Sequence, residues 1–375
     1  MVLLLQCARP HPDDAAIRRA ACAVGDWDAL TEKADYHGMS ALLCWNLMRA
    51  CPDLVPPPAL DRLRQAFNAN AARNLRFASE LVRIASLFER AGIEFVPIKG
   101  PAVAWSLYES PALRQMGDLD LLVRPADASH AVDVLVASGA VPAYGTDLRF
   151  FRSARELPLT SSAGVGLDLH WALAAAQFGH ALDLHHFWSR LVPATFAGRT
   201  FRTFAPNDLL IFLSVHGAKH FWSSLRWLAD LARLIDGASL DWDAIMAYAG
   251  ARRASRIVSA SLLLAADVLG ANVPAAVLDR ARACPHASTI AVQSQLWLHG
   301  RPVPLGPSGL ELRFQWSLLE RPSDKLRLWW GQIAPCPADL DSLSLPRCLF
   351  PVYYAFRPLR LLAKYSAQAA CRLLP

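Results

Sequence analysis

Charged residues and long hydrophobic runs are both scarce in this sequence of 375 residues, of which 19% are charged and 54% hydrophobic. The composition excludes a disordered chain, and the length allows two or three domains with substantial cores. No window reaches the roughly 18 uncharged apolar residues of a membrane span, because the nearest, residues 257–278, contains Asp267 and Pro274. The opening MVLLLQCARP lacks the basic start and the apolar length of a signal peptide, so we expect a cytoplasmic protein without a transmembrane segment.

Cysteine pairs with the spacing of a metal or redox motif are also missing. The eight cysteines form no Cys-x-x-Cys and lie mostly in apolar, helix-like contexts. We therefore predict reduced thiols in the core, in agreement with the cytoplasmic expectation.

Acidic residues are absent from residues 345–375, where basic residues contribute +5 of the net charge of +6. Most of the chain is therefore close to neutral, and no general nucleic-acid-binding surface is expected. The basic residues of this segment alternate with aromatic residues and leucines. This pattern fits either a basic helix that closes the core or a surface helix that contacts anionic lipid.

Two aspartates stand out against the apolar background, because Asp118 and Asp120 lie in one apolar run and are separated only by Leu119. Side chains alternate along a strand, so both carboxylates point to the same face. They repel each other unless a cation lies between them, and Mg²⁺ usually takes one or two carboxylates together with the phosphates of a substrate. The alternative is a solvated pair on an edge strand, with Arg114 or Arg124 as a loose partner.

A third carboxylate is Asp168, in the run VGLDLHWAL. Asp168 and His170 lie on one face of this predicted strand, and apolar residues lie on the other face. We interpret the three aspartates as a possible metal site, with two ligands from one strand and one from a neighbouring strand, open to a triphosphate. An ordinary outward-facing Asp168 is the alternative.

Several further residues accompany the three aspartates. They are Lys99-Gly100, Tyr108, Arg114, the Gly-Asp-Leu-Asp-Leu-Leu-Val run at 117–123, Asp168-Leu169-His170-Trp171, and HGAKHFWSSLRWLADLARLI at 216–235. Together these residues resemble the uncharacterised nucleotidyltransferase family of the DNA polymerase β-like superfamily.

The resemblance implies an α+β fold, with a polymerase β-like nucleotidyltransferase core built on a small mixed sheet and flanked by N-terminal and C-terminal helical regions. It also implies that Asp118, Asp120 and Asp168 are catalytic and bind two Mg²⁺ or Mn²⁺ ions. One departure concerns the phosphate loop, which reads Lys99-Gly100-Pro101 here instead of Gly-Ser or Gly-Gly.

Hydrophobic periodicity gives a coarse division of the chain. We expect an N-terminal helical region at 1–91, a catalytic core at 92–200, a helical domain that lines the cleft at 201–300, and a C-terminal helical, basic region at 301–375. Helices are predicted over 13–50, 57–91, 101–109, 125–138, 242–270 and 274–299, with another that starts at Ser323 after a proline-rich connector at 302–307. Strands are predicted over 93–98, 118–123, 147–153 and 165–171.

Residues 207–236 carry a second dense group of polar residues. If they form one continuous helix, six of them fall within about one third of its circumference, namely His216, Lys219, His220, Ser223, Arg226 and Asp230. We interpret this stripe as a face that lines a cleft, and a solvated helix face is the alternative. Asn70 and Asn74 share a face of another predicted helix and could also reach a ligand.

Phosphate or nucleotide binding is predicted for a set of residues near these carboxylates. Arg226 suits phosphate because its donors match paired oxygens, and Lys99 follows a strand beside a glycine turn. The full set is Lys99, Gly100, Arg114, His216, His220 and Arg226. His216 and His220 also have zinc-site spacing, with Asp230 or His170 as a third ligand, but Gly217 stands where a His-Glu-x-x-His hydrolase has its base.

We predict an enzyme that transfers a nucleoside monophosphate from a nucleoside triphosphate, with ATP as the expected donor, to a small molecule or peptide, and that releases pyrophosphate. Members of the family accompany peptide natural-product genes, so a peptide acceptor and a role in natural-product biosynthesis are expected by association only. A catalytically inactive nucleotide-binding or partner-binding protein of the same fold is the main alternative, and a zinc hydrolase is a third.

Overall fold

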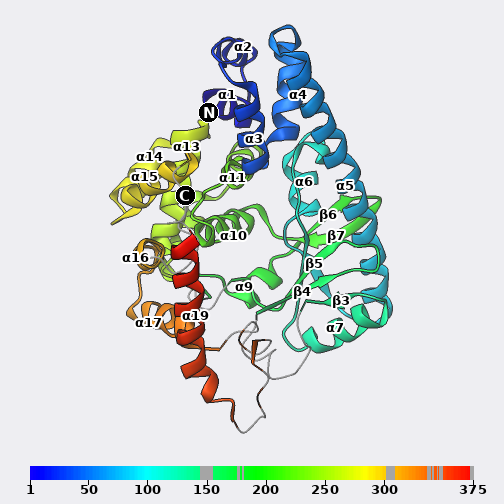
Figure 1. Ribbon diagram of the computed structural model, residues 1–375, viewed down its shortest axis with the longest axis vertical. Coiled ribbons are helices and arrows are strands. Elements are labelled where there is room, and N and C mark those ends of the chain that lie inside the picture. Colours follow the sequence, from blue (N-terminus) through cyan, green and yellow to red (C-terminus); the bar gives the residue numbers. More distant parts are fainter. Residues whose placement is uncertain are drawn as a thin grey trace.

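The computed structural model of this protein places helices around a small five-stranded sheet and a separate two-stranded sheet (Figure 1). It describes residues 1–143, 155–174, 178–179, 181–300, 309–335, 339, 342–343, 345 and 349–371. The strand predicted at 147–153 and the connector predicted at 302–307 lie outside these residues. None of the helices in the described part combines the length and the apolar character that a bilayer crossing needs.

The sheet has five strands in the order β1-β2-β5-β4-β3. Its centre is a parallel pair, β2 and β5, in which Asp120 lies opposite Asp168. The other neighbours are antiparallel, which makes the sheet mixed and confirms the predicted α+β fold. The strands are β1 (Phe95–Pro97), β2 (Leu119–Val123), β3 (Val141–Pro142), β4 (Glu156–Thr160) and β5 (Gly166–His170).

Side chains alternate along each strand, so one face of the sheet is apolar, while the other carries the polar side chains together with Val96 and Leu122, which belong to a second core. The leucines at 119, 121, 167 and 169 are buried in a core with the second half of α5 (Pro57–Arg90) and with α7 (Ala128–Ala137). The side chains of Asp120, Asp168 and His170 lie on the opposite face of the sheet from these leucines. Burial of the leucines therefore directs the polar side chains toward α10 (Pro206–Lys219) and α11 (Leu225–Gly237).

A second and larger core joins helices from the two ends of the sequence. Helix α1 (Val2–Ala8) contacts both α11 and α13 (Ser255–Leu269). Buried residues of α2 (Asp14–Cys22), α3 (Trp27–His37) and α4 (Ser40–Ala50) belong to the same core. Cys7, Cys22, Cys44, Cys51 and Cys284 are free, and Cys7, Cys44 and Cys51 are buried.

Several predicted helices are interrupted in the structure. Residues 13–50 form three helices, because Asp26 caps the start of α3 by accepting from Ala29 N at 2.9 Å and Gly38 ends it with φ of 68°. Residues 242–270 divide into α12 (Trp242–Ala251) and α13, and residues 274–299 into α14 (Ala275–Ala283) and α15 (Ala287–Leu298). Periodicity continues across such breaks, so the spacing of apolar residues alone does not locate them.

Strands β6 (Val192–Phe196) and β7 (Arg199–Thr203), which the sequence pattern does not predict, form a hairpin. The remaining elements are η1 (Pro52–Leu54), α6 (Pro101–Leu107), η2 (Pro111–Leu113), α9 (Leu184–Ser189), α16 (Gly309–Leu318), α17 (Pro322–Ile333) and α19 (Val352–Cys371).

Candidate active site

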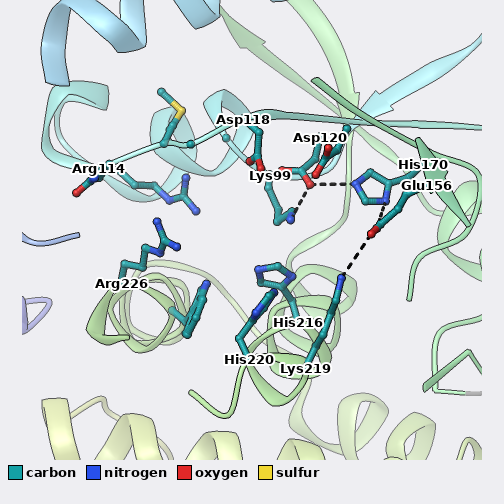
Figure 2. Close-up of a pocket in the computed structure, with 16 residues that line it drawn as sticks. Lys99, Arg114, Asp118, Asp120, Glu156, His170, His216, Lys219, His220 and Arg226 are labelled. Atoms are coloured by element: carbon teal, nitrogen blue, oxygen red, sulfur yellow. Dashed lines mark hydrogen bonds and ion pairs between the residues drawn. The ribbon is translucent and has the colours of Figure 1, made fainter. Parts of the chain in front are cut away.

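A cavity of about 350 Å³ lies between the polar face of the sheet and the turn from α10 to α11. In Figure 2, the acids and Lys99 lie on one side of it, and His216, His220 and Arg226 lie on the other. The structure thus brings together residues that are far apart in the sequence. The lining includes all nine residues predicted for metal, phosphate or nucleotide: Lys99, Gly100, Arg114, Asp118, Asp120, Asp168, His216, His220 and Arg226.

Asp120 is the most constrained of the three aspartates. It is 3% exposed, and its Oδ1 lies 2.6 Å from Lys99 Nζ and 3.0 Å from His170 Nε2. Burial alone would raise the pKa of Asp120, but the charge of Lys99 and the hydrogen bond with His170 outweigh it and hold that pKa well below its usual range. Asp120 is therefore ionised at neutral pH, and Lys99 is committed to an aspartate.

His170 extends this network to Glu156, a residue without a sequence prediction. His170 Nδ1 lies 3.3 Å from Glu156 Oε2, and Lys219 Nζ lies 3.9 Å from Glu156 Oε1. Burial would lower the pKa of His170, but its hydrogen bonds to Asp120 and Glu156 raise it overall. The bond from His170 in turn lowers the pKa of Glu156 to about 2. Glu156 is placed by its register opposite His170 in the β4–β5 pair, which the sequence did not reveal.

Asp118 and Asp168 have no ion-pair partner among the residues that the structure describes. Burial, followed by the charges of Asp118 and Asp120, raises the pKa of Asp168 to about 6. Burial and the charge of Asp120 also raise the pKa of Asp118. Uncompensated carboxylates that destabilise one another are the electrostatic environment that a divalent cation relieves.

The donor set at this position fits such a cation. Asp120, Asp168 and His170 each offer one ligand atom, and these atoms lie within 4.8 Å of one another. Asp118 lines the same cavity but is not part of this tight group. The structure therefore adds His170 to the predicted ligands, and its Nδ1 contact with Glu156 is the kind of outer interaction that orients metal-binding histidines.

Arg114 is held by a buried ion pair that joins the segment before β2 to α11. Its Nε and Nη2 donate to both carboxylate oxygens of Asp230 at 2.8–3.1 Å, and Tyr108 donates to the same Asp230 at 2.7 Å. Arg114 and Asp230 are 8% and 0% exposed. The guanidinium still lines the cavity, but two of its three nitrogens are occupied.

Asn70 and Asn74 support this arrangement from α5 and do not line the cavity. Both side-chain amides donate to the backbone carbonyl of Arg114, at 3.3 Å and 2.8 Å. They also donate to the carbonyls of Ala112 and Pro111. The idea that they reach a ligand is therefore wrong, since their donors position the loop before β2.

The polar stripe at 207–236 does not form one continuous helix. Phe221 and Trp222 adopt positive φ values of 59° and 46°, and the chain turns there between α10 and α11. Gly217 permits the turn, because a Cβ at that position would lie 2.5 Å from Nε1 of the Trp222 indole. His216, His220 and Arg226 still line the cavity, whereas Asp230 is directed to Arg114.

The two histidines of this turn form an aromatic wall with Trp227. The ring centroids of His216 and His220 are 4.8 Å apart, and His220 stacks on Trp227 at 4.9 Å. Burial, followed by the charge of Lys219, lowers the pKa of His220 to about 4. Burial, followed by the charge of Lys99, lowers the pKa of His216 well below its usual value. Both imidazoles are neutral at pH 7, so they offer stacking and neutral hydrogen bonds rather than positive charge. Neither belongs to a group of three metal-ligand side chains in the described part of the chain.

Arg226 is the cation of the cavity that has no carboxylate partner among the described residues. Its guanidinium lies 5.3 Å from the centre of the Trp227 ring. Burial and the nearby charge of Arg114 lower its pKa, although a guanidinium remains charged at neutral pH. Arg226 can therefore receive an anion without breaking an existing ion pair.

Comparison with known proteins agrees with this geometry. A family model described as an uncharacterised nucleotidyltransferase matches residues 24–270, a stretch that contains every residue of the cavity. A search of curated proteins found no match. Because the family model covers most of the chain, the protein belongs to this uncharacterised nucleotidyltransferase family and is a transferase of the nucleotidyl-transferring type.

Proposed function

We propose that the protein transfers a nucleoside monophosphate from a nucleoside triphosphate, with ATP as donor, to a small molecule or peptide, and releases pyrophosphate. The observation that carries the proposal is the meeting of Asp118, Asp120 and Asp168 in one cavity, opposite Arg226, whose guanidinium contacts no carboxylate of the described residues. Negative charge on one side and positive charge on the other suit a metal-bound triphosphate.

Asp120, Asp168 and His170 would hold Mg²⁺ or Mn²⁺, and Asp118 would hold a second ion or a metal-bound water. When bound, the metal supplies charge neutralisation to the attacking and leaving oxygens of an in-line displacement. Lys99 keeps Asp120 ionised. Asp168, which lies opposite Asp120 in the strand pair, would also help to activate the acceptor hydroxyl.

The facing wall would bind the rest of the nucleotide and the acceptor. Arg226 would bind triphosphate oxygens through its paired donors. The rings of His216, His220 and Trp227 offer a flat surface for the base or for an aromatic part of the acceptor. Gly100 has a φ of 58° and brings the backbone close to Asp118, whose carbonyl oxygen lies 3.3 Å from where a Cβ would stand.

A nucleotide-binding protein without turnover is the second candidate. It is supported by Lys99 and His170, which already neutralise one oxygen of Asp120 at 2.6 and 3.0 Å. The transferase is favoured because neither Asp118 nor Asp168 forms an ion pair within the described part of the chain, and a protein that needed no metal would gain stability by replacing them.

A labelling experiment tests the proposal. The protein is incubated with each α-labelled nucleoside triphosphate and Mg²⁺ or Mn²⁺, and pyrophosphate and labelled product are measured. Asp120→Asn and Asp168→Asn are each expected to lower turnover by ~10²-fold or more, because charge stabilisation by the metal is lost. Asp133→Asn, an exposed position on α7, serves as the control and keeps full activity.

Turnover that persists in both cavity variants would rule out the proposed mechanism. Tight nucleotide binding with no product from any donor would select the second candidate.

A further inference from the structure

Helix α17 turns an apolar stripe toward solvent. One of its faces carries four large apolar residues at i, i+3, i+4 and i+7: Leu326, Trp329, Trp330 and Ile333. Such a stripe ordinarily packs against a core, yet these side chains are 69%, 57%, 59% and 39% exposed. Leu328, which is 4% exposed, already packs the inward side of the same helix. The exposed stripe is therefore additional to the face that closes the core.

Helix α19 extends this apolar face. It contacts α17 on the side of the molecule away from α5 and α7 (Figure 1), and the rings of Trp330 and Tyr354 lie 5.5 Å apart. Tyr353 is buried, whereas Val352 and Leu359, one heptad apart, are 45% and 65% exposed. The name α17–α19 surface is used below for six side chains: Leu326, Trp329, Trp330, Ile333, Val352 and Leu359.

Basic residues accompany this surface, while the two aspartates that the structure describes in this segment are buried. Residues 321–375 contain eight Lys and Arg and three Asp, a net charge of +5. Asp324 and Asp339 are 0% exposed and form ion pairs with Arg327 and Arg357. Lys325 has no carboxylate partner among the described residues, and its Nζ lies 5.0 Å from the centre of the Trp316 ring. Among the described residues of this segment, the acids are therefore buried and paired, while Lys325 keeps a positive charge that no carboxylate contacts.

We propose that the α17–α19 surface docks this protein on the headgroup region of a membrane that contains anionic lipid. A helix with an exposed Leu, Trp and Ile stripe can lie in the plane of the interface, where Trp favours the boundary between headgroups and acyl chains. Lys325 and Arg321 stand beside the stripe and can reach anionic headgroups.

The position of the surface in the chain separates it from the transfer chemistry. The family model ends at residue 270, and the whole α17–α19 surface lies beyond that point. The cavity residues all lie within the matched stretch. Membrane docking would therefore determine where the reaction takes place without contributing a residue to it.

Three other exposed apolar side chains lie apart from one another and form no such stripe. Tyr36, Leu75 and Val292 are 65%, 67% and 60% exposed, but they lie on three different helices, α3, α5 and α15. Single exposed apolar residues are normal on a protein surface. These three positions therefore provide a control that removes a similar apolar area elsewhere.

Sedimentation with lipid vesicles tests the proposal on the full-length protein. We expect binding to phosphatidylcholine vesicles that contain about 30% phosphatidylglycerol, and weaker binding as NaCl is raised from about 0.05 to 0.5 M. Leu326→Ser/Trp329→Ser/Trp330→Ser should weaken that binding by ~10-fold or more, because the inserted apolar area is lost. Tyr36→Ser/Leu75→Ser/Val292→Ser should bind as wild type does.

A second variant separates docking from folding. Trp329→Phe/Trp330→Phe keeps the surface apolar and should bind vesicles as wild type does, but brominated lipid should quench less of its fluorescence. Wild-type protein that stays in the supernatant, or a triple Ser variant that binds within about twofold of wild type, overturns the proposal. Equal affinity for vesicles of pure phosphatidylcholine overturns the anionic requirement. A wild-type dimer that the triple Ser variant abolishes, without vesicle binding, would assign the surface to a second copy of the chain instead.

Discussion

At the scale of single residues, the site contains a row of linked basic and acidic side chains, and these contacts shift the pKa values of Asp120, His170 and Glu156. Lys99 and His170 share one oxygen of Asp120, and Glu156 contacts the far nitrogen of His170. Asp118 and Asp168 remain outside this row and carry the charge that a metal ion would balance. His170 thereby links the two strands that carry the acids to β4.

Glu156→Gln tests the role of this outer contact. Loss of the carboxylate removes the acceptor that orients His170, so we expect Mn²⁺ affinity to fall by ~10–100-fold, measured by calorimetric titration. Glu89→Gln, at an exposed ion pair with Arg199, should leave the affinity unchanged. Equal Mn²⁺ affinity in wild type and Glu156→Gln would show that His170 needs no carboxylate partner.

Breaking the Arg114–Asp230 pair is expected to be costly. Asp230→Asn leaves the buried Arg114 charge uncompensated, and the free energy of unfolding should fall by ~3–5 kcal/mol, measured by urea denaturation. The double variant Arg114→Met/Asp230→Leu removes both charges and should regain most of that loss. If the double variant were less stable than Asp230→Asn, the cost would come from packing rather than from the unpaired charge.

At the scale of elements, the turn between α10 and α11 determines which polar residues face the cavity. Trp222 is fully buried and packs directly against Gly217. The turn separates His216 on α10 and the C-cap residue His220 from Arg226 on α11, yet keeps all three on the cavity wall. A continuous helix would have placed Asp230 on the same stripe, where the structure instead pairs it with Arg114.

Gly217→Ala tests the close approach of this turn. The added methyl group must displace the Trp222 indole, which should cost ~1–3 kcal/mol of stability and weaken nucleotide binding through Arg226. Gly237→Ala is the matched control, because no atom lies within 4 Å of a Cβ at that helical position. Urea denaturation and nucleotide titration measure the two effects, and equal behaviour of the two variants would contradict the account.

At the scale of the whole molecule, the N-terminal helices are anchored on the C-terminal helices by contacts that include His37. His37 is 1% exposed and its Nδ1 accepts from Leu225 N at the start of α11, at 3.4 Å. Ser224 donates to the His37 carbonyl at 2.9 Å. Burial, followed by the charge of Lys33, lowers the pKa of His37 to about 4.

The lowered pKa predicts acid sensitivity of this junction. Unfolded His37 titrates near ~6.5, so its neutral form stabilises the fold fully above that pH, and ~3 kcal/mol is lost as pH falls from about 6.5 toward 4. We expect the unfolding free energy of wild type to fall more steeply over this range than that of His37→Gln, measured in urea. Parallel curves for the two proteins would contradict the assignment.

Much of the fold and part of the site follow from local sequence pattern. Alternation predicts that Asp118 and Asp120 point the same way, and both line the cavity, although Asp118 directly precedes β2. Apolar strands predicted at 93–98, 118–123 and 165–171 agree with β1, β2 and β5. Helices at 57–91, 101–109 and 125–138 agree with α5, α6 and α7. Helices and strands depend mainly on residues that are close in the sequence, so the spacing of apolar residues is enough to predict them.

Only the tertiary structure determined which residues far apart in the sequence form ion pairs and hydrogen bonds with one another. The sequence offered Lys99 and Arg114 for phosphate, but folding commits Lys99 to Asp120 and Arg114 to Asp230. Glu156 joined the site only through the register of β4 against β5. A charged residue has the same local pattern whether its partner is a ligand or another side chain, and the choice is determined by which buried charges the fold brings within contact.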